Sequence, residues 1–137
     1  MDTIIEMGLG QFYESRWKHL IPSTARWRQH MEFCLARGFL MVHEYQGKVD
    51  GYMAGIVGPM MFSDSLQLLE LTLYVVPEKR NGRIAIELIK AFEQYGRDNG
   101  VVECFAGSSA GIKVEGVRRI YEHCGWQYVG DLMVRSL

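Results

Sequence analysis

Hydrophobic positions follow two different spacings along this chain, and these spacings predict its secondary structure. Apolar residues recur every three or four positions in four segments, which predicts helices, and they alternate or cluster in five shorter segments, which predicts strands. The helices are expected over residues 3–12, 24–37, 81–98 and 114–124, and the strands over residues 39–45, 49–57, 66–76, 101–106 and 126–134. The expected order is therefore ααβββαβαβ. Because a helix joins the third and fourth strands, these two are expected to be parallel, so the fold class is α/β with a mixed sheet.

Single residues mark where several of these elements begin or end. Thr3 and Glu6 have the spacing of a capping box, which predicts the start of the first helix. Gly38 is placed to end the second helix. Pro77 lacks an N–H group and therefore ends the third strand.

The third strand has the clearest alternation in the chain. Side chains that alternate along a strand point to opposite faces of the sheet. One face is expected to hold Leu69, Leu71, Leu73 and Val75, and the other Leu68, Glu70, Thr72, Tyr74 and Val76. Glu70 stands out in this strand because an acidic side chain among apolar ones costs free energy unless it is paired or functional.

Composition and charge exclude several classes of protein. The 137 residues have a mass of 15.7 kDa, the usual size of one domain, so a single domain over residues 1–137 is expected. A net charge of −1 argues against binding nucleic acid or an anionic membrane through bulk charge. No apolar stretch is long enough to cross a membrane, and Asp2 and Glu6 stand where a signal peptide needs positive charge, so a cytoplasmic location is expected. The three cysteines and four histidines lack metal-ligand spacing, so no metal site is expected.

The sharpest candidate for chemistry is the segment Val75–Ala85, VVPEKRNGRIA. A strand ends here, a short basic turn with a glycine follows, and a helix begins at once. Free amides at the start of a helix bind phosphates readily, and Arg80 and Arg83 would add charge-assisted contacts. Taken alone, the pattern also fits a plain connection between a strand and a helix.

Together with a second segment, this junction resembles the GNAT superfamily of acetyl-CoA-dependent N-acyltransferases. The family's main signature, V-x-P-x-x-[RQ]-x-x-G-x-[GA], and its C-terminal signature, roughly Y-E-x-x-G-[FW], occur here in the expected order. The matching residues are Val75, Pro77, Arg80 and Ala85 for the first and Tyr121, Glu122, Gly125 and Trp126 for the second. The resemblance spans nearly the whole chain, and small acyltransferase-like proteins of bacteriophages look similar in this region.

The resemblance implies a GNAT-like fold with acetyl-CoA as co-substrate. It implies that backbone groups of the third strand hold the pantetheine arm and that amides of the junction hold the pyrophosphate. The implied residues are Leu73, Tyr74 and Val75 for the first role and Arg80, Asn81, Gly82, Arg83, Ile84 and Ala85 for the second. Three features depart from the family pattern: Arg83 replaces a usual glycine, Val114 replaces a frequent asparagine, and the first strand is absent or very short.

Two residues are candidates for acid–base catalysis. An amine must lose a proton before it attacks a thioester, and Glu70 is the candidate base; the alternative is an edge-exposed or salt-bridged glutamate. The resemblance implies that Tyr121 protonates the departing thiolate, while its spacing fits a core tyrosine equally well. Ser108 and Ser109 are weaker candidates for orienting the substrate.

These observations lead to an N-acetyltransferase that transfers an acetyl group from acetyl-CoA to a primary amine in a ternary complex. The alternative is a non-catalytic module of the same fold that binds a protein partner or acyl-CoA. A third hypothesis, a nucleic-acid accessory protein, rests on residues 16–18 and 26–28, Arg-Trp-Lys and Arg-Trp-Arg, and the net charge opposes it. Exposed strand edges also lead us to expect a homodimer. The acceptor amine is not named by any motif.

Overall fold

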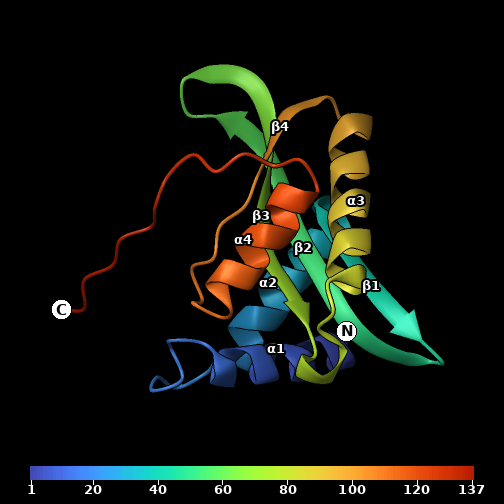
Figure 1. Cartoon of the computed structure of the whole chain (residues 1–137), viewed down its shortest axis with the longest axis vertical. Coiled ribbons are helices and arrows are strands. Elements are labelled where there is room, and N and C mark those ends of the chain that lie inside the picture. Colours follow the sequence, from blue (N-terminus) through green and yellow to red (C-terminus); the bar gives the residue numbers. More distant parts are fainter.

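The computed structural model describes residues 1–137 and has the mixed α/β architecture that the sequence predicts (Figure 1). Its elements are α1 (Asp2–Glu14), α2 (Thr24–Arg37), β1 (Phe39–Tyr45), β2 (Lys48–Met60), β3 (Ser63–Val75), the 3₁₀-helix η1 (Pro77–Lys79), α3 (Arg83–Asp98), β4 (Val101–Phe105) and α4 (Val114–His123). The sheet order is β1-β2-β3-β4; β1, β2 and β3 are antiparallel neighbours, and β4 is parallel to β3. The chain enters α1 directly, without a strand before it.

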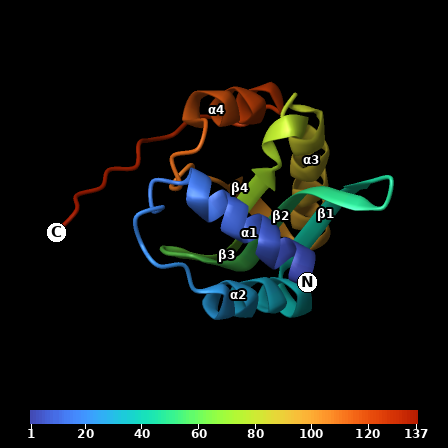
Figure 2. The ribbon, with the colours of Figure 1, turned by 90° about the horizontal axis from the view of Figure 1, so that it is seen from below.

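Helices cover both faces of the sheet, and each face has its own hydrophobic core (Figure 2). On one face, α1 and α2 enclose a cluster that includes Ile5, Met31 and Tyr52. On the other face, α3 packs its predicted stripe against the sheet, with Phe92 wholly buried, and α4 covers the edge of this second cluster. A cavity lies on this second face, between β3, α3 and α4.

The predicted helix boundaries hold at α2 and fail at the start of α1. Ser23 caps α2 by accepting a hydrogen bond from the Arg26 amide over 3.2 Å. The capping box expected at Thr3 and Glu6 is wrong, because α1 begins at Asp2 and no side chain caps it. The apolar residues next to Thr3 are buried from the first turn, so core packing sets this helix start.

Gly38 ends α2 as predicted, but the reason is a close approach and not a left-handed backbone. Its φ of −133° is open to any residue. A Cβ atom at Gly38 would lie 2.5 Å from the carbonyl oxygen of Gly55 in β2. The absence of a side chain therefore lets the end of α2 rest directly on the sheet.

The alternation expected along β3 is interrupted by a bulge, which corrects the predicted faces. Gly55 pairs with Glu70 and Ala54 pairs with Thr72, so Leu71 has no partner in β2. An unpaired extra residue shifts the pattern of faces by one position. Leu68 consequently packs in the same core as Val75, while Thr72 hydrogen-bonds to Gln11 of α1 on the opposite face. The alternation fails because the sequence shows which residues favour a strand but not where its pairing skips one.

The predicted strand at 126–134 is wrong, and the sheet has four strands where five were expected. The segment runs away from the body of the protein toward the C-terminus (Figure 1). Its apolar side chains, Val129, Leu132, Met133 and Val134 among them, are exposed. The outer edge of β4 therefore has no strand beside it.

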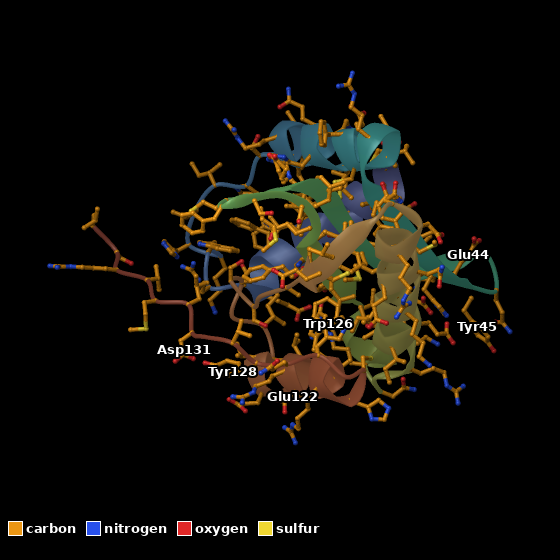
Figure 3. The ribbon with its side chains drawn as sticks, turned by 90° about the horizontal axis from the view of Figure 1, so that it is seen from above. Glu44, Tyr45, Glu122, Trp126, Tyr128 and Asp131 are labelled. Carbon is orange, nitrogen blue, oxygen red and sulfur yellow. The ribbon has the colours of Figure 1, made fainter.

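The first residues of this segment contact α3 and α4 instead of pairing with β4. The Trp126 indole donates a hydrogen bond to Glu93 of α3 over 2.6 Å. The guanidinium of Arg118 in α4 lies 4.1 Å from the centre of the Tyr128 ring, and the Tyr128 hydroxyl bonds to Asp131. Trp126, Tyr128 and Asp131, which are labelled in Figure 3, lie beside α4. The chain is thus held along the helix layer, away from the edge that a fifth strand would need.

Candidate active site

The site forms where β3 and β4 separate. The two strands pair only from Leu66 to Leu69 of β3, and β4 ends at Phe105. Beyond this point β3 continues to Val75 with β2 on one side and no strand on the other. A cavity of about 360 Å³ occupies the opening, between β3, the start of α3, the loop after β4 and α4.

Backbone groups of β3 face this opening at alternate residues. The Val76 amide donates to the Asp50 carbonyl of β2, so the groups of Val76 and Tyr74 are directed to β2. The alternation leaves the backbone N–H and C=O groups of Leu73, and the carbonyl of Val75, on the open side. Of the three residues expected to hold a pantetheine arm, Leu73 presents both backbone groups, the Val75 carbonyl already accepts a hydrogen bond from Arg80, and Tyr74 directs its backbone groups to β2.

The start of α3 offers amides without partners inside the protein. Gly82 precedes the helix with φ 88°, a left-handed conformation that favours glycine. The amides of Gly82, Ile84 and Ala85 have no hydrogen-bond acceptor in the protein. Gly82 and Ala85 line one end of the cavity, where unpartnered amides and the positive end of a helix dipole favour a negative charge.

The other three amides expected at this junction already have acceptors. The Arg80 amide bonds to the Pro77 carbonyl and the Asn81 amide to the Lys79 carbonyl, within the turn of η1. The Asn81 side chain accepts a hydrogen bond from the Arg83 amide over 3.1 Å. The Arg83 side chain itself is exposed, so it does not crowd the unpartnered amides.

Arg80 is anchored inside the protein. Its Nε donates to the Val75 carbonyl over 2.8 Å, and its guanidinium forms an ion pair with Glu14 of α1 over 2.8 Å. Tyr74 donates a second hydrogen bond to Glu14 over 2.5 Å. Burial raises the pKa of Glu14, but these partners outweigh it and lower the pKa below its ordinary value. Arg80 therefore joins α1 to the end of β3 at the cavity wall, with its charge paired to Glu14.

Glu70 lies at the point where the strands part. Its Oε2 accepts a hydrogen bond from the Gly107 amide over 3.3 Å, and it takes part in no ion pair. Burial raises the pKa of Glu70 to about 7, although the Gly107 amide lowers it in part. A carboxyl group with such a pKa is divided between its two protonation states near neutral pH, which suits a general base.

Tyr121 enters the same cavity from α4. Its hydroxyl is buried and has no hydrogen-bond partner, and its ring packs against Trp126 with 4.7 Å between centroids. Burial raises the pKa of Tyr121, and the charge of Glu70 raises it further. The cavity therefore contains a carboxyl group that can accept a proton and a phenol that is protonated at neutral pH.

The bulge at Leu71 is what brings these two residues together. Strict alternation places Glu70 on one face with Thr72 and Tyr74. The structure instead places Glu70 in the cavity with Leu73 and Tyr121, across the sheet from α1.

A second cavity of about 670 Å³ lies on the α1 and α2 side. Gln11, Ser109 and Ala110 line both cavities, so the two adjoin. Of the two serine candidates, Ser108 lines the first cavity only and Ser109 lines both. The wall of the second cavity is mostly apolar and includes Trp17 and Trp27.

In each of the two basic–aromatic motifs, one arginine forms contacts within the protein. Arg16 donates from its Nε to the Ser109 carbonyl over 2.7 Å and stacks on Trp17. Arg28 pairs with Asp2 at the start of α1 over 2.5 Å. The arginines thus hold loops and helices in place, and the tryptophans face the second cavity.

Sequence reasoning missed two polar residues of α1. Gln11 accepts a hydrogen bond from the Tyr52 hydroxyl over 2.8 Å and donates one to Thr72 over 2.9 Å, at the junction of the cavities. Glu14 holds Arg80 and Tyr74, as described above. The apolar residues of α1 show which face of the helix is buried, but no sequence signal shows that these two polar residues also point to the sheet.

The fold is similar to that of several solved acetyltransferases. An aminoglycoside acetyltransferase from an uncultured soil metagenomic sample shares 18% sequence identity, with a TM-score of 0.68 over 98% of this chain and 90% of the other. The ribosomal-protein-alanine N-acetyltransferase of Brucella melitensis biovar Abortus 2308 shares 14% identity, with a TM-score of 0.71 over 99% and 94%. AAC(6')-Iy, solved with the bisubstrate analogue CoA-S-monomethyl-acetylneamine, shares 18% identity, with a TM-score of 0.69 over 98% and 92%.

These likenesses show that the chain has the same fold as these acetyltransferases, in agreement with the fold that the two sequence motifs predict. No protein-family model matches the sequence, and no curated protein matches it. None of the helices is both long and apolar enough to cross a membrane.

Proposed function

We propose that this protein is an N-acetyltransferase that transfers the acetyl group of acetyl-CoA to a primary amine. The observation that carries the proposal is the cavity between β3 and β4. Glu70 and Tyr121 both line it, and so do Gly82 and Ala85, whose amides have no partner. The fold, shared with named acetyltransferases, supports the same reaction.

The residues of the cavity fit acetyl-CoA along its length. Leu73 offers its backbone N–H and C=O groups to an amide-rich arm, in the way that an edge strand offers them to another strand. The amides at the start of α3 suit a pyrophosphate, and the side chains of Lys79 and Lys113 line the same cavity. Acetyl-CoA supplies the acetyl group as a thioester.

The chain's own residues can carry both proton transfers. Glu70 accepts a proton from the acceptor ammonium, which frees the nitrogen lone pair for attack on the thioester carbonyl carbon. A C–N bond forms, the tetrahedral intermediate collapses with cleavage of the C–S bond, and Tyr121 donates its proton to the departing sulfur. The second proton on the attacking nitrogen then passes to the Tyr121 oxygen, which leaves a neutral amide and restores the phenol. Once protonated, Glu70 no longer raises the pKa of Tyr121 through its charge, so the first transfer favours the second.

Two measurements test the proposal. Calorimetric titration with acetyl-CoA, with adenosine as a control, measures cofactor binding, and release of free thiol in the presence of amines measures turnover. Micromolar acetyl-CoA binding together with amine-dependent thiol release supports the enzyme. Binding without thiol release on any amine refutes it and leaves a module that binds acyl-CoA without turnover.

A further inference from the structure

The two adjoining cavities have more basic than acidic side chains in their walls. Among all the residues that line either cavity, Glu70 is the only acidic one. The second cavity has no carboxylate in its wall and carries two basic side chains, Arg26 and His30. A molecule with several ammonium groups would therefore find one acidic partner and meet a cation further out.

The walls of the second cavity are suited to an apolar body. They include Leu9, Phe12, Trp17, Leu20, Trp27 and Leu71, from α1, the loop after it, α2 and β3. Leu20 is about half exposed, and Ile21 beside it is almost fully exposed. Aromatic and aliphatic side chains that gather around a hollow of about 670 Å³ bind an apolar group by removing its surface from water.

The bulge of β3 connects the apolar wall to the catalytic carboxyl group. Leu71, the bulged residue, lines the second cavity, and its neighbour Glu70 lines the first. A compound whose apolar part rests against Leu71 and Trp17 can therefore direct an amine past Ser109, which lines both cavities, toward Glu70.

We infer that the acceptor is a small primary amine with one basic nitrogen and an aromatic or aliphatic body, not a polycation such as an aminoglycoside. This inference rests on the proposed function. It separates this chain from those structural relatives that are named aminoglycoside acetyltransferases.

The test compares kcat/KM for 2-phenylethylamine, ethylamine, kanamycin and an N-terminal alanine peptide. Phenylethylamine is expected to exceed ethylamine, which lacks the apolar body, by about 10-fold or more, and to exceed kanamycin by more than that. A preference for kanamycin or the peptide, or equal values for ethylamine and phenylethylamine, would overturn the inference.

A binding measurement keeps this test separate from the test of the proposed function. Trp17 and Trp27 line the second cavity, so phenylethylamine should change the intrinsic tryptophan fluorescence even without turnover. If phenylethylamine binds and kanamycin does not, but no thiol is released, the proposed function fails and the ligand class stands. If kanamycin binds at least as tightly, the ligand class fails whatever the turnover.

Two variants test whether phenylethylamine binds in the second cavity. Leu20→Ala should raise KM for phenylethylamine several-fold and leave acetyl-CoA affinity unchanged, because Leu20 lines only the second cavity. Phe33→Ala is the matched control, since Phe33 is half exposed on α2 and lines neither cavity. An equal change of KM in both variants would contradict the assignment of this cavity to the acceptor.

Discussion

Replacing Glu70 by glutamine tests the mechanism most directly, because the change keeps the shape of the side chain and removes its titration. With a pKa of about 7, Glu70 is roughly one-tenth ionised at pH 6 and nine-tenths ionised at pH 8. The wild-type kcat/KM should therefore rise about 10-fold across this interval. Glu70→Gln should lower kcat/KM by about 10²-fold or more at pH 8 and should flatten the rise.

The same substitution has a predicted effect of opposite sign on stability. Folding raises the pKa of Glu70 from 4.5 to about 7, so the folded state holds the proton more tightly than the unfolded state does. The folded protein therefore loses stability as the pH rises through this window, by about 3 kcal/mol in all. Glu70→Gln should match the wild type near pH 4 and should be more stable than the wild type above pH 7.

The assay is thiol release at saturating acetyl-CoA across pH 6–9, paired with urea unfolding at pH 4 and pH 8. Glu103→Gln in β4 is the control, because Glu103 is exposed and lies outside both cavities. A normal pH profile in Glu70→Gln would refute the base role and would indicate water or another group. A loss of stability at pH 8 would refute the claim that burial sets the pKa of Glu70.

The remaining predictions concern the acid, the phosphate end and the packing of α2. Tyr121→Phe should lower kcat about 10-fold or more with little change in acetyl-CoA affinity, whereas unchanged turnover would remove Tyr121 from the mechanism. Arg80→Ala should weaken acetyl-CoA binding more than acetyl-pantetheine binding, as measured by calorimetry, and equal losses would contradict a phosphate role. Gly38→Ala should cost about 1–3 kcal/mol in urea unfolding, because its Cβ would meet the Gly55 carbonyl at 2.5 Å. Gly58→Ala, which meets nothing within 4 Å, should cost less, and equal costs would refute the close-contact argument.

Some elements could be predicted from the sequence because the spacing of their apolar residues, or a single turn or capping residue, determines them. Ser23 begins α2, Pro77 follows β3, and the stripe of α3 packs as its helical spacing indicates. The junction between β3 and α3 belongs to this class too, because a strand, a glycine turn and a helix occupy adjacent positions in the sequence.

Features that depend on a distant partner could not be predicted in this way. The bulge at Leu71 arises from pairing with β2, and it changes which side chains Glu70 meets. The segment after Trp126 alternates like a strand, yet its contacts to α3 and α4 keep it from β4. Gln11 and Glu14 were missed for the same reason, since their importance comes from β2, β3 and Arg80, which lie far away in the sequence.

The separation of β3 from β4 also has a consequence for local motion. Past Leu69, β3 is held by hydrogen bonds on one side only, so backbone protons on its open side lack the protection that a flanking strand gives. The Leu73 amide should therefore exchange with deuterium faster than the Tyr74 amide, which is directed to β2. Acetyl-CoA should slow exchange at Leu73 far more than at Tyr74, so that the ligand completes the sheet in place of the missing strand.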